Sequence, residues 1–208
     1  SLDQPTKSER DAAIMEALKH SAKELLGLKL TRTQLQAFEN YAFELTAWNQ
    51  HTNLTTILDP RGILIKHFLD SLSCLLAIKC HRNPNRTVSV IDVGSGAGFP
   101  GLPLAIVNPE IHLTLVDATK KKCEFLRHMV AKLDLPTTRV IHQRAETLGG
   151  DPEHRGRYDW AIARAVASLP VLLEYLLPTT RSGGCCLAQK TEAALAEIQD
   201  AARALAVL

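Results

Sequence analysis

With 208 residues and a formal net charge of +2, the chain is long enough for one domain with a well-formed hydrophobic core. Hydrophobic residues make up 46% and charged residues 22%, which is ordinary globular usage and excludes disordered and fibrous classes. The longest charge-free stretch, residues 93–109, contains three prolines, and residues 1–10 are too polar for a secretory signal. We therefore expect a soluble, cytoplasmic protein that makes no membrane contact.

The first 86 residues predict an all-helical region. Apolar residues recur at helical spacing over residues 6–27, 33–51 and 63–78. Gly27 is a natural stop signal, and the polar, proline-containing residues 80–86 predict a linker. We therefore expect an N-terminal helical region, residues 1–86, followed by a second domain, residues 87–208.

From residue 87 the pattern changes to short β-branched runs that alternate with helical segments. Strands are expected at residues 88–93, 111–117, 139–143, 158–164 and, after a Gly183-Gly184 turn, 185–189. Helices are expected at residues 100–107, 120–133 and 192–207. This alternation predicts an α/β fold with a doubly wound, mostly parallel sheet.

The cysteines and the basic residues limit which kinds of partner the protein can bind. The five cysteines are odd in number and lack the spacing of a zinc site, so we expect buried, reduced thiols and no bound metal. Lys and Arg outnumber acidic residues five to one in residues 61–86 and seven to two in residues 120–144. Such local excess suits an anionic partner such as RNA, although basic side chains also simply solvate helix faces.

The chemistry-bearing segment is the turn that follows the first predicted strand, from Asp92 to Gly101. Its glycines at alternate positions, Gly94, Gly96 and Gly98, permit positive φ and let the backbone pass close beneath a ligand. The spacing from Gly96 to Gly101 also fits a dinucleotide fingerprint, which by itself is a weak signal. The acidic residue two positions before the first glycine instead resembles the first motif of class I S-adenosylmethionine methyltransferases.

Other polar residues follow the later strands and would meet at the same edge of the sheet. Asp117 closes the second strand, where its carboxylate could accept hydrogen bonds from both ribose hydroxyls. Ala145 and Glu146 follow the third strand, where an adenine would lie, although Glu146 could equally start a helix. Arg164 ends an otherwise apolar strand and needs a partner, either a ligand or a structural carboxylate.

Taken together, these segments resemble the ribosomal RNA small-subunit methyltransferase G family, also called glucose-inhibited division protein B. The resemblance covers roughly residues 35–190, and it is specific only as a combination of motifs. The motifs are residues 53–55, 67–72, 92–103, 115–117 and 145–146, residues 164–167 (Arg-Ala-Val-Ala), and Lys121 with Phe125 and Leu126. Family members continue past the last helix with two more strands, so we expect residues 87–208 either to lack those strands or to have a different sheet edge.

The resemblance implies S-adenosyl-L-methionine as cofactor and methylation at N7 of a guanine in 16S ribosomal RNA, either naked or in the small ribosomal subunit. It implies cofactor contacts at Gly94, Phe99, Asp117, Ala118, Thr119, Ala145, Glu146 and Arg164. We expect RNA contacts at Lys66, His67, Lys121, Lys122 and Arg127. For His67, a core or capping role is an equally good alternative. We expect a monomer.

The predicted mechanism needs no catalytic acid or base, and none is assigned. Guanine N7 carries a free lone pair at neutral pH, so catalysis reduces to alignment and exclusion of water. Enzymes that modify exocyclic amines carry an Asn/Asp-Pro-Pro-aromatic turn where this chain has Arg164 and small residues. Enzymes that modify pyrimidine C5 need a cysteine at that edge, whereas Cys185 and Cys186 lie within a predicted strand. Both differences favour N7.

Three alternatives remain open. The chain could methylate another RNA or substrate, or act as a nicotinamide-dependent oxidoreductase through the same glycines. It could also be a non-catalytic module that binds a cofactor or RNA. Titration with S-adenosylmethionine and NAD separates the two cofactor hypotheses, and a methyl-transfer assay identifies a non-catalytic module.

Overall fold

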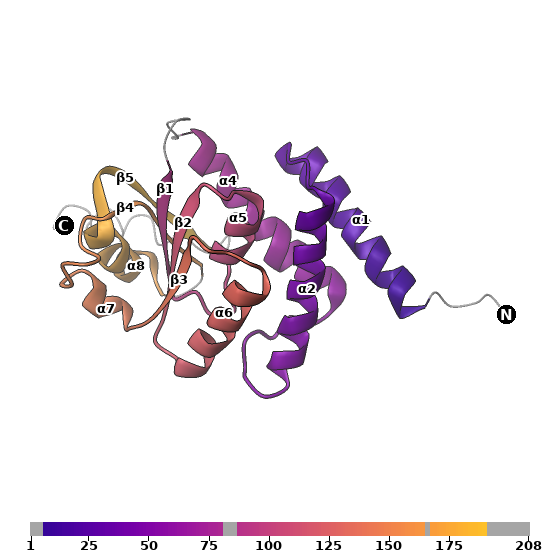
Figure 1. The fold of residues 1–208 in the computed structure, drawn as a ribbon. Coiled ribbons are helices and arrows are strands. Elements are labelled where there is room, and N and C mark those ends of the chain that lie inside the picture. The colour runs from indigo at the N-terminus through magenta and orange to yellow at the C-terminus, as the bar shows by residue number, and fades with distance from the viewer. Residues whose placement is uncertain (1–5, 81–86, 165–166, 191–208) are drawn as a thin grey trace.

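The computed structural model describes residues 6–80, 87–164 and 167–190 (Figure 1). Its centre is a sheet of five strands in the order β3-β2-β1-β4-β5, and every neighbouring pair is parallel. The strands are β1 (Val88–Val93), β2 (Ile111–Asp117), β3 (Thr138–His142), β4 (Tyr158–Arg164) and β5 (Thr180–Gln189). The predicted doubly wound parallel sheet is confirmed.

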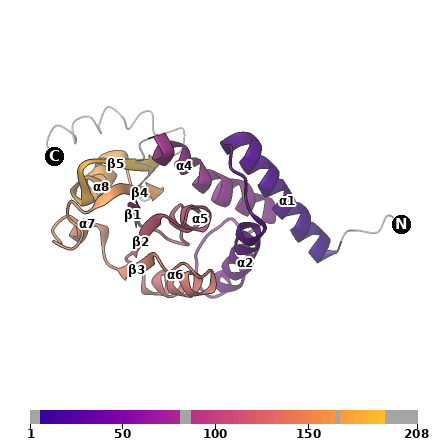
Figure 2. The ribbon, with the colours of Figure 1, turned by 45° about the horizontal axis from the view of Figure 1, so that its top comes forward.

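Helices cover both faces of this sheet, as Figures 1 and 2 show. One face carries α5 (Gly101–Val107) and α6 (Lys120–Lys132), and the other carries α7 (Ala145–Leu148), α8 (Leu169–Leu176) and the 3-10 turn η2 (Leu177–Thr179). Side chains alternate along β1, because Val90 packs in the core on the first face and Ile91 in the core on the second. The strands are therefore buried on both sides, as parallel strands usually are.

The N-terminal region is helical, as predicted. It contains α1 (Lys7–Leu26), α2 (Arg32–Asn49), α3 (Pro60–Gly62), the π-helix η1 (Ile63–Leu69) and α4 (Asp70–Cys80). Thr6 and Thr31 begin α1 and α2 with reciprocal capping boxes. Phe38 and Phe68 from these helices share one apolar core with Leu102 and Leu115 beside the sheet. The division into regions 1–86 and 87–208 stays a prediction, because residues 81–86 lie outside the described part.

One prediction about local structure was wrong. Gly183 and Gly184 do not form a turn before the last strand but lie inside β5, which begins at Thr180. The pairing jumps from Tyr158–Thr180 to Trp160–Cys185, so the extra residues form a bulge, and Gly183 has a φ of 76°. The helix expected over residues 63–78 is confirmed, although its first part, Ile63–Leu69, has π-helical geometry before α4 begins.

Other features lie outside what the sequence predicted. The short helix α8 was not expected, whereas α7 fits the alternative that Glu146 starts a helix. The helix expected over residues 192–207 lies outside the described residues. No helix in the described part of the chain is both long and apolar enough to cross a membrane.

Candidate functional site

The glycine turn leaves β1 and is held against the end of β2 by its own backbone. The amides of Gly94 and Ser95 both donate to the carbonyl of Val116, at 2.8 and 2.9 Å. Gly94, Gly96 and Gly98 have φ values of 71°, 58° and 96°, the left-handed region that glycine tolerates best. The turn is therefore a fixed stretch of backbone at the carboxyl edge of the sheet, with Gly94 and Gly96 partly exposed and Gly98 buried.

Two of these glycines have opposite surroundings. A Cβ placed on Gly98 would lie 2.4 Å from Cδ1 of Leu102 and 2.6 Å from the hydroxyl of Tyr41. A Cβ on Gly96 would meet only the carbonyl oxygen of Gly94, at 3.9 Å. Gly98 thus needs to be glycine for packing, whereas Gly96 borders open space. A ligand could lie against the backbone at Gly96, which fits the cofactor that the sequence predicts.

Asp92 supports the turn from inside the protein. Its carboxylate is fully buried, and Oδ2 accepts a hydrogen bond of 2.8 Å from the amide of Gly101. Burial raises the pKa of Asp92 to about 7, although the bond from Gly101 and the charge of Arg164 act in the opposite direction. Oδ1 has no hydrogen-bond partner among the described residues. Asp92 therefore fixes the backbone at Gly101, where α5 begins.

Asp117 joins the end of β2 to the glycine turn. Its side chain is almost buried, with Oδ2 accepting from the amide of Gly96 at 2.9 Å and Oδ1 accepting from that of Thr119 at 2.8 Å. Each carboxylate oxygen has a second lone pair, so the group can still accept bonds from ribose hydroxyls. Ala118 and Thr119 are exposed on the turn that follows. The predicted cofactor residues from β1 and β2 are therefore brought together.

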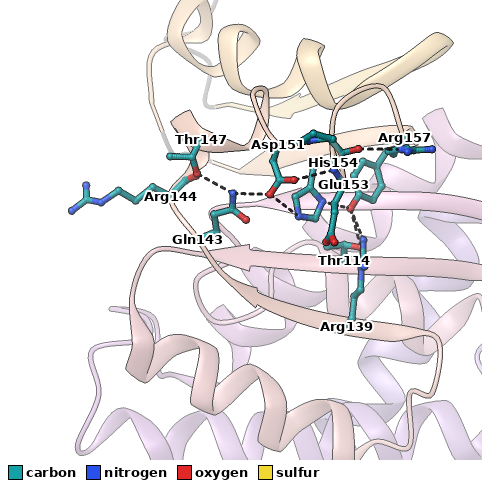
Figure 3. A network of polar contacts seen from close by, with 11 residues as sticks. Thr114, Arg139, Gln143, Arg144, Thr147, Asp151, Glu153, His154 and Arg157 are labelled. Atoms are coloured by element: carbon teal, nitrogen blue, oxygen red, sulfur yellow. Dashed lines mark hydrogen bonds and ion pairs between the residues drawn. The ribbon is translucent and has the colours of Figure 1, made fainter.

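Ala145 and Glu146 lie in the next loop, at the start of α7. Glu146 is exposed, and its carboxylate is 3.8 Å from the guanidinium of Arg144. Gln143 ties this helix to the loop before β4, because its amide donates to Thr147 Oγ1 at 3.0 Å and to Asp151 Oδ2 at 3.4 Å (Figure 3). The position of α7 thus depends on side chains that follow β3.

The same network continues into the sheet (Figure 3). Nδ1 of His154 lies 2.9 Å from the hydroxyl of Tyr158, which also accepts a hydrogen bond of 3.0 Å from Arg139. His154 is buried, and burial lowers its pKa. Arg139 also donates to Thr114 Oγ1, at 3.0 Å. These contacts anchor the loop before β4, which carries His154, to three strands of the sheet.

Phe99 does not present its ring to a ligand. The ring is 3% exposed and stacks against His67, with centroids 4.4 Å apart, and against Tyr41, at 5.1 Å. Cζ of Arg164 lies 4.9 Å from the centroid of the same ring. Any contact between Phe99 and a cofactor therefore falls to its backbone.

Arg164 is bound to the N-terminal helices by several contacts. It donates to the carbonyl of Lys66 at 3.0 Å and approaches Nδ1 of His67 at 3.3 Å and Oδ2 of Asp70 at 3.5 Å. The guanidinium thus has structural partners, which matches the ion-pair alternative raised by the sequence. Contact with a cofactor remains a prediction for Arg164.

His67 is a neutral, buried link between η1 and the rest of the site. Burial and the charge of Arg164 lower its pKa to about 4. Because Arg164 can only donate, Nδ1 of His67 accepts, and Nε2 donates to Oγ1 of Thr55 at 2.9 Å. The imidazole is only 4% exposed, a geometry that favours the core interpretation over direct contact with RNA.

The predicted RNA-binding side chains border the same edge of the sheet. Lys121, Lys122 and Arg127 lie on α6, which begins just after β2, and Lys66 lies on η1 beside Arg164. Lys66, Lys121 and Arg127 are exposed, and Lys122 is half-buried. The arrangement offers positive charge on two sides of the glycine turn. No group of His, Cys, Asp and Glu among the described residues could hold a metal ion.

Sequence reasoning missed several residues that hold the site together. The hydroxyl of Tyr41 donates to the carbonyl of Ala97 at 2.5 Å, and the sequence showed Tyr41 only as part of an apolar helix face. Thr55 and Asp70 stood within recognised motifs, but nothing in the pattern indicated their partners His67 and Arg164. These contacts span long distances in sequence, which spacing cannot reveal.

Comparisons with known proteins agree with this geometry. The family model described as rRNA small subunit methyltransferase G matches residues 34–208. The Ribosomal RNA small subunit methyltransferase G of Roseiflexus castenholzii is 50% identical over 88% of this chain and 76% of its own length. That of Desulforamulus reducens is 44% identical over 92% and 78%. The expected family is confirmed.

A solved structure supports the fold separately. The SAM-dependent methyltransferase from Agrobacterium tumefaciens superposes with a TM-score of 0.51 at 15% identity, over 65% of this chain and 49% of that one. At this identity the likeness shows the fold alone, which is that of class I methyltransferases. From its sequence match and its architecture, the chain belongs to the rRNA small subunit methyltransferase G family.

Proposed function

We propose that this protein transfers the methyl group of S-adenosyl-L-methionine to N7 of a guanine in 16S ribosomal RNA. Family membership supports the reaction class, and the family resemblance noted in the sequence supports the atom that is methylated. The observation that carries the proposal is the glycine turn, which is open at Gly96 and bonded to the carboxylate of Asp117. In class I folds a ligand lies at the carboxyl edge of such strands.

The residues at this edge suit the parts of the cofactor. Backbone at Gly94 and Gly96 can lie under the nucleoside, and Asp117 has free lone pairs for the ribose hydroxyls. The loop with Ala145 and Glu146 would face the adenine. When bound, the cofactor supplies an electrophilic methyl group on a positively charged sulfur.

In the proposed reaction the protein positions the guanine rather than removing a proton from it. The N7 lone pair forms a bond to the methyl carbon as the carbon–sulfur bond breaks, and the bonding electron pair stays on sulfur. The purine gains one positive charge, and no proton leaves. His67 is buried and both of its ring nitrogens have partners in the protein, Arg164 and Thr55, which is consistent with a mechanism that needs no base. Alignment and a dry site supply the rate enhancement.

We place the RNA across α6 and η1, with Lys66, Lys121, Lys122 and Arg127 near phosphates. His67 would act indirectly, by holding the guanidinium of Arg164 and the ring of Phe99 in place. We also propose that the protein works as a monomer in the cytoplasm. Of the exposed large apolar side chains among the described residues, Phe43 and Leu58 line one hollow, and Leu25, Ile65 and Leu76 lie on α1, η1 and α4. Sedimentation at assay concentrations would contradict the monomer if a stable dimer appeared.

A methyl-transfer assay tests the proposal. The protein is incubated with radiolabelled S-adenosylmethionine and small ribosomal subunits from a strain that lacks this methyltransferase, and the RNA is then mapped by mass spectrometry. We expect one 7-methylguanosine in 16S RNA. Parallel incubations with naked 16S RNA identify the form of the substrate. No incorporation into either form, or NAD binding without a response to S-adenosylmethionine, would overturn the proposal.

A further inference from the structure

We propose that Asp70 recognises the target base, by accepting hydrogen bonds from N1–H and the exocyclic N2 amine of guanine. This inference rests on the proposed function and identifies the side chain that selects guanine. Asp70 stands where η1 ends and α4 begins, within the His-Phe-Leu-Asp-Ser-Leu segment, residues 67–72. The methyl-transfer mechanism itself assigns no task to this carboxylate.

The contacts of Asp70 place it beside the glycine turn. Its Oδ2 is 3.5 Å from Nη1 of Arg164, and the guanidinium of Arg164 lies against the ring of Phe99 at 4.9 Å. The side chain of Asp70 is 47% exposed, whereas that of Arg164 is 19% exposed. The carboxylate is therefore held by a less exposed partner and is still open to a ligand.

The strand order places Asp70 on the substrate side of the edge. The residues proposed for the ribose and adenine follow β2 and β3, which form one half of the sheet. Asp70 contacts the ends of the other half, because Arg164 closes β4 and Gln189, which closes β5, donates to the carbonyl of Asp70 at 2.7 Å. A base that receives the methyl group near β1 and β4 would extend toward Asp70.

Unused acceptors gather at this point. Oε1 of Gln189 is buried and has no hydrogen-bond partner among the described residues. Oδ1 of Asp70 and the free lone pairs of its Oδ2 are further acceptors. A buried acceptor without a donor is unfavourable, so this end of β5 suits a ligand that brings donors. The other carboxylates described at this edge are otherwise placed, since Asp92 is buried and Asp117 is bonded to the glycine turn. Glu146 lies beside Arg144 after β3, at the far end of the sheet from β4 and β5.

Guanine has the matching chemistry. Its N1–H and N2 amine point the same way and can pair with one carboxylate, whereas adenine presents an acceptor at N1. N7 lies on the opposite edge of the purine, so a base held by Asp70 turns N7 away from the carboxylate and toward the methyl group. The negative charge also stabilises the positive charge that the purine gains during transfer. Asp70 would therefore lower the barrier as well as select the base.

The test combines a protein change with a change in the base. Small subunits are reconstituted with ligated 16S RNA carrying either guanosine or inosine, which lacks the N2 amine, at the target position. Asp70→Ala removes the carboxylate, Asp70→Asn keeps its shape but presents an amide, and Asp11→Asn on α1 is the matched control. Thermal unfolding shows whether each variant is folded, and kcat and KM are measured for both substrates.

With wild-type protein, inosine should lower kcat/KM by about 10- to 100-fold, the equivalent of one hydrogen bond to a charged group. Asp70→Ala and Asp70→Asn should lower kcat/KM on guanosine by at least as much, and Asp11→Asn should not. In Asp70→Ala, replacing guanosine by inosine should lower kcat/KM by less than about 3-fold, because the carboxylate that would pair with the N2 amine is gone. Equilibrium binding of Asp70→Ala to the guanosine and inosine forms of the small subunit, measured with S-adenosylhomocysteine present, should show the same loss of discrimination.

Two results would overturn the inference. If Asp70→Ala lowers kcat/KM by the same factor for guanosine and inosine, so that inosine remains as poor a substrate as before, the carboxylate only supports Arg164. If calorimetry shows that Asp70→Asn binds S-adenosylmethionine as poorly as it methylates RNA, the carboxylate serves the methyl donor instead. Failure of the wild-type protein to methylate the guanosine substrate would contradict the proposed function itself, and so is distinguished from both.

Discussion

The imidazole of His67 lies flat against the ring of Phe99, with centroids 4.4 Å apart and planes inclined by 11°. His67 belongs to η1 of the N-terminal helices, and Phe99 belongs to the glycine turn. Arg164 at the end of β4 contacts both rings. The N-terminal helices therefore help to form the site, since η1, the glycine turn and the end of β4 are distant in sequence but pack together here.

The burial of His67 predicts a pH-dependent contribution to stability. Its pKa is about 4 in the folded protein, against about 6.5 for an unfolded chain, so below pH 6.5 the unfolded state binds the proton and the folded state does not. The contribution is therefore complete above about pH 6.5 and decreases as pH falls toward 4. Relative to His67→Asn, whose amide oxygen can replace Nδ1, the wild type should lose about 3 kcal/mol across that window.

Urea unfolding at several pH values measures this difference. The pKa of Asp92, raised to about 7, acts with the opposite sign, but it is present in both proteins and cancels. A difference in the free energy of unfolding that is flat between pH 4 and 6.5 would show that His67 titrates normally.

Asp117 should contribute to binding of the methyl donor. Asp117→Ala removes the acceptor for the ribose and the bonds to Gly96 and Thr119, so affinity should fall about 10- to 100-fold. Calorimetric titration with S-adenosylmethionine measures the change, and Asp11→Ala on α1 is the control. Unchanged affinity would mean that the carboxylate acts on the turn alone.

The glycines of the turn should respond differently to alanine. Gly98→Ala forces a methyl group against Leu102 and Tyr41, which should destabilise the fold by about 1–3 kcal/mol more than Gly156→Ala. Gly156 also has a positive φ, 63° against 96° for Gly98, but open surroundings, so it carries backbone strain without the clash. Denaturant unfolding gives the two values, and equal losses would contradict the packing described around Gly98.

Gly96→Ala should separate ligand binding from folding. A methyl group there meets only open space, so its cost in stability should equal that of Gly156→Ala. The same methyl group would occupy the space proposed for the cofactor, and the affinity for S-adenosylmethionine should fall by more than about 10-fold, or ~1.4 kcal/mol. A stable variant with normal affinity would place the cofactor elsewhere.

The basic side chains of α6 should hold RNA through its phosphates. Lys121→Gln and Arg127→Gln should each reduce the slope of log affinity against log salt concentration by about 1. Lys29→Gln, an exposed change between α1 and α2, is the control and should leave the slope unchanged. Filter binding to small subunits over a range of salt gives the slopes. A flat salt response in the wild type would remove α6 from the RNA surface.

Much of the fold follows from local patterns in the sequence. The β-branched run at Val88–Val93 predicts a strand buried on both faces, and the glycines that follow predict the turn. Gly183 shows the limit of such reasoning, because the same residue suits a turn and a bulge. Only the pairing of β5 with β4 distinguishes them.

The site was less predictable because its contacts are not local. Arg164 was correctly expected to need a partner, but its partners lie 94–98 residues earlier in the chain, at Lys66, His67 and Asp70. The family resemblance implied a cofactor contact at Phe99, yet the ring of Phe99 packs inward against Tyr41. Side-chain direction depends on neighbours that spacing alone does not supply.

The central claim is that the turn from Gly94 to Gly98 is the floor of the S-adenosylmethionine site. A crystal structure with S-adenosylhomocysteine tests it most directly. We expect the nucleoside over the backbone of Gly96, with both ribose hydroxyls bonded to Asp117. Density for the ligand at any other place on the protein, with this turn bare, would contradict the account.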